Sequence, residues 1–197
     1  MNVSADSPNL LRSPCLMSRR DTALLLIDLQ ERLLPVIERG AAIIENAERL
    51  ILTAQIFEMP ILATEQYPKG LGPTVQPIRQ LLGDLPEKLT FSACGVSNLL
   101  ADLPSRGVHK LLLAGVEAHV CVQQTALDLL SAGFDVYIAV DAIGSRFDSD
   151  KEIALRRLEA AGAVLTTTEA TMFEWCERAD DPQFKQVSRL VRKKQAE

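Results

Sequence analysis

The stretch that decides the fold is KLLLAGV at residues 110–116, an apolar run that follows a single lysine. A strand with one wet face alternates apolar and polar residues, so an unbroken run is typical of a strand buried on both faces. The segment from about His119 to Ala132 has the pattern of a helix, and Gly133 indicates its C-terminal cap. Residues 110–133 therefore predict a strand followed by a helix, the repeating unit of an α/β fold.

The same alternation extends in both directions along the chain. Further strands are predicted over residues 23–27, 60–64, 88–92, 135–140 and 163–165. Further helices are predicted over residues 40–57, 74–82, 96–105 and 150–161. Strands that alternate with helices imply right-handed crossovers and helices on both faces of the sheet. The sequence predicts a three-layer α/β/α sandwich around a mostly parallel, six-stranded, Rossmann-like sheet.

Length and composition are those of one globular domain. The chain has 197 residues, of which 47% are hydrophobic and 24% charged. The first twenty residues lack the apolar core of a secretory signal, and we expect residues 1–20 to form a disordered tail before a single domain at 21–197. Their arginines and serines also resemble a transit peptide, against which Asp6 argues.

The net charge and the kinds of residue present limit the partners, compartment and cofactors that we expect. A net charge of −5 argues against nucleic acid and anionic membranes, since both bind a concentrated basic face. The four cysteines are widely spaced without a CxxC pair, which indicates free thiols in a reducing, cytoplasmic compartment. With only two histidines, no metal site is expected. The segment DLQE at 28–31 after the first strand has no glycine for a dinucleotide phosphate, so no cofactor is expected.

Ligands of such folds bind beyond the carboxyl ends of the strands, which directs attention to Asp28, the loop after Thr64 and the turn from Val116 to Cys121. Cys121 opens a predicted helix, where unpaired amide groups and the helix dipole favour a thiolate. The alternative for any single cysteine is a small buried hydrophobe.

Two charged residues are further candidates. Asp28 ends an apolar run, where a charge is costly unless it is paired or functional, and the alternative is a helix cap. Lys88, near the third predicted strand, is able to pair with Asp28, and the alternative is a surface lysine.

Four segments together resemble the isochorismatase-like superfamily of cysteine hydrolases, which includes nicotinamidases and N-carbamoylsarcosine amidohydrolase. The segments are LIDLQ at 26–30, TEQYPKGLG at 64–72, KLTFS at 88–92 and GVEAHVCVQQTA at 115–126. The resemblance extends from about Thr22 to Thr168, and the ordered combination is specific although each segment alone is weak. The 64–72 loop is similar to that of isochorismatase-domain-containing proteins, a subgroup without the nicotinamidase metal site.

The resemblance implies a catalytic triad of Asp28, Lys88 and Cys121. Asp28 would accept the thiol proton, Lys88 would stabilise the charges, and the Cys121 thiolate would attack a carboxamide-like carbon. It also implies a cis peptide between Val116 and Glu117, with the amides of Glu117 and Cys121 directed at an oxyanion. A carboxylate at Glu117 would raise the pKa of the thiol unless it points away or meets a cation.

The resemblance further places Gln30, Gln66, Tyr67 and His119 as substrate-binding candidates in a homo-oligomer, although a surface position is the alternative for His119. Residues 64–67 read TEQY where nicotinamidases have metal ligands, so a metal-assisted pyridine amidase is not expected. Isochorismatases proper lack the nucleophilic cysteine, so Cys121 argues against their enol-ether reaction. We expect a cysteine-dependent hydrolase of a small carboxamide or related C–N bond. The alternatives are a non-catalytic binding or scaffold protein that retains the fold, and a redox-active thiol protein.

Overall fold

The computed structural model describes residues 12–192, in which strands and helices alternate along the chain. The strands are β1 (Thr22–Ile27), β2 (Ile61–Gln66), β3 (Glu87–Lys88), β4 (Lys110–Val116), β5 (Asp135–Gly144) and β6 (Val164–Thr166). The helices are α1 (Gly40–Ile56), α2 (Pro68–Leu71), α3 (Gln76–Leu82), α4 (Gln123–Ser131), α5 (Asp148–Ala160), α6 (Thr168–Cys176) and α7 (Phe184–Val191).

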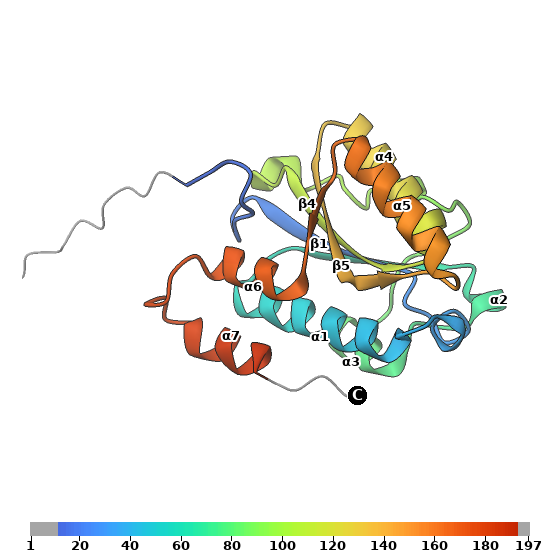
Figure 1. The fold of residues 1–197 in the computed structure, drawn as a ribbon, viewed down its shortest axis with the longest axis horizontal. Helices are drawn as coiled ribbons and strands as arrows, with labels where there is room; N and C mark the ends of the chain where they lie inside the picture. Colours follow the sequence, from blue (N-terminus) through green and yellow to red (C-terminus); the bar gives the residue numbers. More distant parts are fainter. Residues whose placement is uncertain (1–11, 193–197) are drawn as a thin grey trace, which may run out of the picture.

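The strands form one six-stranded sheet in the order β3-β2-β1-β4-β5-β6, and every pair is parallel. Helices α4 and α5 cover one face of the sheet, and α1, α3, α6 and α7 lie on the opposite side (Figure 1). The predicted three-layer α/β/α fold is therefore confirmed. The order of the strands in the sheet reverses direction between β1 and β4, and doubly wound sheets bind their ligands at this position.

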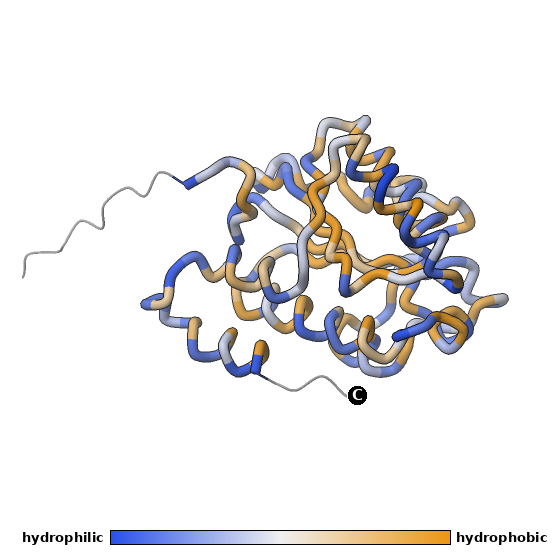
Figure 2. The backbone as a smooth tube through the Cα atoms, in the orientation of Figure 1, coloured by the Kyte–Doolittle hydropathy of each residue, from blue (hydrophilic) through white to orange (hydrophobic). Residues whose placement is uncertain are grey.

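Burial on both faces explains why the inner strands are continuously apolar. Successive side chains of β1 point to opposite faces of the sheet: Leu24 and Leu26 pack with α1, whereas Leu25 and Ile27 pack with α4 and α5. The hydrophobic residues accordingly follow the strands through the middle of the molecule, with polar residues on the outer sides of the helices (Figure 2).

The third strand is shorter than the sequence predicted. It ends at Lys88 instead of Ser92, because the chain turns and brings the carbonyls of Thr90 and Phe91 back to the Lys88 ammonium, at 3.3 and 2.9 Å. Leu89 is left 78% exposed by this turn. The apolar residues after Lys88 therefore do not belong to the sheet.

The helix predicted over residues 96–105 is absent, and two 3₁₀ turns, Ala93–Gly95 and Pro104–Arg106, lie in irregular chain instead. Asn98 has a left-handed φ of 61°, which no helix accommodates. Conversely, α6 and α7 were not predicted. No helix within residues 12–192 is long and apolar enough to cross a membrane.

Residues 12–20, which we expected to belong to a disordered tail, pack against the domain. Met17 is fully buried and the Tyr137 hydroxyl donates to the Cys15 carbonyl at 2.9 Å. Arg12 donates to the carbonyl of Glu174 at 2.6 Å. Apolar burial and these contacts hold residues 12–20 against the domain, whereas residues 1–11 lie outside the described part of the chain.

Candidate active site

Three strand ends each bring one side chain to the carboxyl edge of the sheet. Asp28 follows β1, Lys88 closes β3, and Cys121 lies in the π-helical turn Ala118–Val122 after β4. Lys88 Nζ is 2.7 Å from Asp28 Oδ2, and the Cys121 thiol lies close enough to both side chains for them to affect its pKa. The structure thus brings together the three residues for which the resemblance implied a triad.

Lys88 is held by four acceptors. Its ammonium contacts the Asp28 carboxylate, Gln66 Oε1 at 2.6 Å, and the carbonyls of Thr90 and Phe91. Its side chain is only 1% exposed. A buried ammonium is costly unless it is paired and hydrogen-bonded, and here every donor has a partner. Lys88 is therefore an internal cation fixed in position, which excludes the surface alternative.

Asp28 is fully buried and has a left-handed backbone, with φ at 55°. Few residues other than glycine adopt this conformation, and aspartate is among those that tolerate it. Its second carboxylate oxygen accepts from the Thr64 hydroxyl at 2.9 Å. Burial raises the pKa of the Asp28 carboxyl above its ordinary value, although Lys88, Cys121 and Thr64 each favour the charged form. A buried carboxylate beside a thiol is a suitable proton acceptor.

Cys121 does not have the ready thiolate that its place at the start of a helix predicted. Burial, followed by the charge of Asp28, raises the pKa of the Cys121 thiol to about 12, and Lys88 only partly offsets this. The thiol is 5% exposed. These surroundings therefore favour the protonated thiol of Cys121, beside one buried ion pair.

Thr125 joins the cysteine turn to the loop that follows Lys88. Its hydroxyl donates to the Cys121 carbonyl at 2.7 Å and accepts from the Ala93 amide at 2.9 Å. The residue is fully buried. One hydroxyl with both bonds satisfied thus fixes the spacing between two of the three site segments.

The peptide bond between Val116 and Glu117 is cis, as the resemblance implied. The Glu117 carboxylate turns to Arg146, accepting from its Nε at 2.7 Å and from its backbone amide at 3.0 Å. Glu117 therefore meets a cation, which is one of the two arrangements that keep its charge from opposing a thiolate at Cys121.

His119 lies on the same turn and has a partly exposed side chain. Its Nδ1 is 3.0 Å from the Ser145 hydroxyl and 3.6 Å from Glu117 Oε2, and its Nε2 is 3.7 Å from Asp150 Oδ2. The ring thus connects the cysteine turn to the loop between β5 and α5, and it retains exposed surface for a ligand.

The three other substrate-binding candidates divide into two kinds. Gln30 is fully buried, and its amide exchanges hydrogen bonds with the backbone of Gln66 and donates to the Gly72 carbonyl at 2.6 Å. Gln66 is 8% exposed and binds Lys88 and the Leu89 carbonyl. Both side chains are thus hydrogen-bonded within the protein, and they brace the segments around Lys88. Tyr67, in contrast, is 50% exposed.

Several residues of this region were not singled out from the sequence. Thr64 was predicted only to end a strand. Thr125 lies inside a predicted helix, and its place there does not indicate that its hydroxyl bonds to the cysteine turn. Arg146 is 29 residues from Glu117, in a loop, so nothing in the local pattern pairs the two. Within residues 12–192, no group of three or more His, Cys, Asp or Glu side chains is placed to hold a metal ion.

Comparison with known proteins identifies the family of the chain. The isochorismatase domain family matches residues 22–170. Isochorismatase domain-containing protein 2 of Danio rerio is 38% identical over 176 residues, which cover 89% of either chain. Isochorismatase domain-containing protein 1 of Danio rerio is 39% identical over 170 residues, and the match spans 84% of this chain but 59% of the relative's length.

Solved structures share the fold. The MAR1 ribonuclease of Caenorhabditis elegans superposes with a TM-score of 0.86 at 38% identity, covering 92% of this chain and 95% of that one. YcaC of Pseudomonas aeruginosa, solved with hexane-2,5-diol and covalent acrylamide, has a TM-score of 0.80 at 25% identity over 89% of this chain and 91% of that one. The YcaC gene product of Escherichia coli, described as an octameric hydrolase of unknown specificity, has a TM-score of 0.83 at 25% identity and covers 91% of both chains. By its family match, its relatives and its fold, the chain belongs to the isochorismatase-like hydrolase family.

Proposed function

We propose that the protein is a cysteine-dependent hydrolase that cleaves a small carboxamide or a related C–N bond. The observation that carries the proposal is the convergence of Asp28, Lys88 and Cys121, with the Lys88 ammonium 2.7 Å from Asp28 and the thiol beside both. Nucleophilic cysteines act with a base within hydrogen-bond reach and a third group that orients the base. Asp28 is the base in this scheme, and Lys88 orients it.

The reaction proceeds in two stages. Asp28 takes the proton from Cys121 as the sulfur attacks the carbonyl carbon, and the C–N bond then breaks as Asp28 returns that proton to the leaving nitrogen. The acyl group remains on sulfur as a thioester. Asp28 next removes a proton from water, which attacks the thioester and releases the carboxylic acid with the thiol restored. Amides of the turn, those of Glu117 and Cys121, are proposed to hold the oxyanion in both stages.

A covalent adduct in a similar protein suggests a chemical probe for this proposal. YcaC of Pseudomonas aeruginosa was solved with covalent acrylamide. Acrylamide is a small carboxamide whose alkene carbon is attacked by nucleophiles such as thiolates. A similar molecule is therefore a reasonable first probe for the site of this chain.

Two other functions have weaker support. A binding or scaffold protein has no need of a base and a buried cation at the same thiol. The ribonuclease name of the similar Caenorhabditis elegans protein implies an RNA substrate, but RNA binding depends on phosphate contacts from basic side chains. The present chain carries a net charge of −5.

The decisive experiment is a screen of small primary amides, ureas and carbamoyl compounds for ammonia release. Turnover by the native protein that is lost in Cys121→Ala and retained in Cys94→Ala is the expected result. Cys94 is the matched control, because its thiol is partly buried, with a raised pKa, and lies outside the triad. Turnover that persists in Cys121→Ala, or degradation of RNA in place of the amides, contradicts the proposal.

We also propose a cytoplasmic homo-oligomer. All four cysteines are free, as a reducing compartment requires. Three large hydrophobic side chains are exposed just after the ends of the neighbouring strands β2 and β3: Tyr67, Leu89 and Phe91. Exposed apolar groups of this kind often mark contact surfaces. Analytical ultracentrifugation is expected to give a species larger than the 21.6 kDa monomer. Leu89→Asp is expected to shift it toward the monomer, and a native monomer contradicts the proposal.

A further inference from the structure

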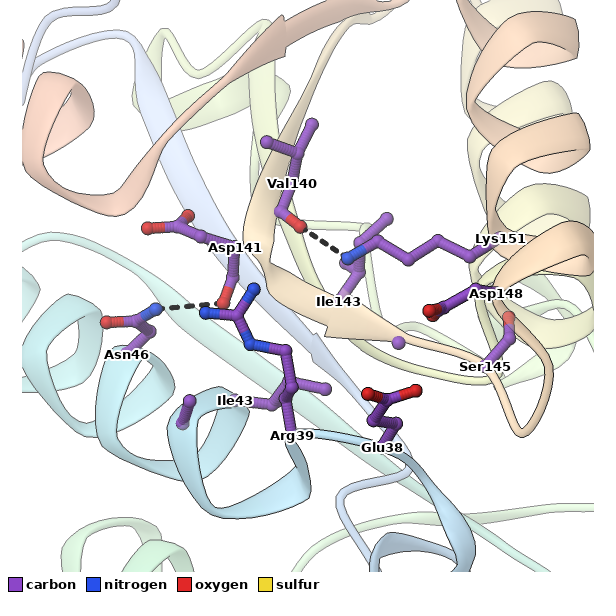
Figure 3. Close-up of a pocket in the computed structure, with 12 residues that line it drawn as sticks. Glu38, Arg39, Ile43, Asn46, Val140, Asp141, Ile143, Ser145, Asp148 and Lys151 are labelled. Atoms are coloured by element: carbon purple, nitrogen blue, oxygen red, sulfur yellow. Dashed lines mark hydrogen bonds between the residues drawn. The ribbon is translucent and has the colours of Figure 1, made fainter. Parts of the chain in front are cut away.

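A cavity lies at the carboxyl end of β5, separate from the triad. It has a volume of about 320 Å³ and lies between the start of α1, the end of β5 and the start of α5 (Figure 3). None of Asp28, Lys88 or Cys121 lines it. The reaction proposed above therefore makes no use of this space.

Two cations face the cavity from opposite helices. Figure 3 shows Arg39, at the start of α1, and Lys151, on α5, directing their charged ends toward the same space below Val140. Lys151 Nζ donates to the Val140 carbonyl at 2.8 Å, and no carboxylate of residues 12–192 forms an ion pair with either cation. Both charges thus face the cavity without a direct ion pair among the described residues.

A bound anion would stabilise the charged form of Lys151. Burial lowers the pKa of the Lys151 ammonium, and the charge of Arg39 lowers it further, against the attraction of Asp148 and Asp141. Asp141 is engaged elsewhere, since its carboxylate accepts from the Thr168 amide and hydroxyl at 2.8 and 3.0 Å. A carboxylate placed between the two cations would receive charge-assisted hydrogen bonds from both.

Two carboxylates limit what this ligand can be. Glu38, Asp141 and Asp148 all line the cavity. Since the Asp141 carboxylate is bonded to Thr168, the two cations are left with two other carboxylates in the wall. A doubly charged anion such as phosphate would be repelled by these two carboxylates. A molecule with one carboxylate and one ammonium group satisfies both kinds of wall residue.

We propose that this cavity is a binding site for a small amino-acid zwitterion. Its carboxylate lies between Arg39 and Lys151, and its ammonium group faces Glu38 and Asp148. Ser145 also lines the cavity, and its hydroxyl is hydrogen-bonded to His119. His119 is two residues before Cys121, so the cavity adjoins the cysteine turn. Binding here does not depend on the reaction at Cys121.

The test is a chemical-shift titration of the ¹⁵N-labelled full chain with L-alanine, L-glutamine, propionate and inorganic phosphate. Saturable shifts around Arg39 and Lys151 are expected with at least one of the two amino acids, more weakly with propionate, and not with phosphate. Arg39→Gln is expected to weaken both amino acid and propionate by about tenfold or more, because a charged hydrogen-bond partner is lost. Asp148→Asn is expected to weaken the amino acid while leaving propionate unchanged or tighter.

Controls separate this site from the rest of the chain. Arg156→Gln, on the exposed face of α5, is expected to bind as the native protein does, because Arg156 pairs with Glu152 and does not line the cavity. Cys121→Ala is expected to retain the full titration. The proposal is overturned if no amino acid saturates at millimolar concentrations, if binding survives Arg39→Gln, or if phosphate or propionate binds more tightly than both amino acids. Lys151→Arg, which keeps the charge, is expected to retain binding.

Discussion

Cys121 shares its surroundings with two opposite charges, and the balance between them sets the state of the thiol. A thiolate next to the Asp28 carboxylate places two anions around one ammonium in a space with little water. Burial is the larger cause of the raised pKa, and the charge of Asp28 is the second. Lys88 compensates only one anion at a time. Proton transfer from Cys121 to Asp28 keeps the number of charges constant, so it avoids that cost.

The pH dependence of alkylation tests this account of Cys121. With a thiol pKa of about 12, the thiolate fraction rises about tenfold for each pH unit below it. The rate of Cys121 modification by iodoacetamide is therefore expected to climb steadily between about pH 7 and pH 10 without a plateau, as followed by peptide mass mapping. Asp28→Asn removes a charge and a hydrogen bond that raise this pKa, so that variant is expected to react faster at neutral pH. A plateau in the native protein below about pH 9 would contradict the assignment.

The buried ion pair gives a second prediction, on stability. Lys88→Met leaves the fully buried Asp28 carboxyl without its cation, and such losses cost about 3–5 kcal/mol. The pKa of Asp28 is already raised in the folded protein, and loss of Lys88 raises it more. The folded state then holds this proton at pH values where the unfolded chain has released it, so the stability of the variant falls as the pH rises through these values.

Urea unfolding at several pH values measures this effect. Lys88→Met is expected to regain stability relative to the native protein as the pH is lowered, and the double variant Asp28→Asn with Lys88→Met is expected to recover most of the loss at neutral pH. A loss below about 1 kcal/mol in the single variant would show that the pair lies in contact with water.

At the scale of elements, β1 and β4 approach each other closely just before the segments that carry Asp28 and Cys121. Gly115 in β4 has φ at 132°, and a Cβ atom built there would lie 2.1 Å from the carbonyl oxygen of Ile27. Ile27 precedes Asp28 directly. Neither strand has room to withdraw, because each is flanked by another strand and covered by helices on both faces. The glycine therefore sets the spacing between the Asp28 and Cys121 segments.

Gly115→Ala is accordingly expected to cost at least about 3 kcal/mol and to abolish turnover, because a strained φ and a backbone clash add at one residue. Gly133→Ala is the matched control. Gly133 also has a positive φ, of 86°, but a Cβ atom added to it would have no neighbour within 4 Å. Its substitution is expected to cost about 1 kcal/mol, from the backbone conformation alone. Equal losses of unfolding free energy in the two variants would contradict the role given to the close approach.

The elements also show what can be predicted from a sequence of this kind. The apolar runs of β1 and β4 depend on burial at both faces, so local pattern was sufficient to predict them and the positions of Asp28 and Cys121. The end of β3 depends on hydrogen bonds from the Lys88 side chain, which are set by the turn itself and by Gln66. The raised pKa of Cys121 depends on packing depth, which no local pattern contains.

Helix α6 begins with a capping residue that is visible in the sequence. The Thr167 side chain accepts from the Ala170 amide, which is a common way for a helix to begin. Arg146, by contrast, reaches Glu117 only because β5 is paired beside β4, so its role follows from the assembled sheet.

At the scale of the whole molecule, the segment before β1 ties the two ends of the domain together. The Met17 amide donates to the Glu174 carboxylate of α6 at 2.8 Å, and Arg19 pairs with Asp181 at 2.8 Å ahead of α7. The Arg19 guanidinium also lies 4.8 Å from the ring centre of Phe57, at the end of α1. The beginning and end of the described chain therefore close over the same end of α1.

Met17 is the apolar anchor of this closure, and its truncation gives the last prediction. Its side chain is fully buried in the core layer that contains α1 and Trp175. Met17→Ala is expected to destabilise the protein by about 2–5 kcal/mol, the range for large-to-small substitution in a packed core. Leu16→Ala, one residue earlier, is the control: Leu16 is 39% exposed, and its loss is expected to cost less than about 1 kcal/mol. Both values come from urea unfolding followed by the fluorescence of Trp175, the single tryptophan of the chain, which lies in the same layer. If residues 12–20 were instead a loose tail, the two substitutions would have the same small effect, and the segment would have no part in holding α6 and α1 together.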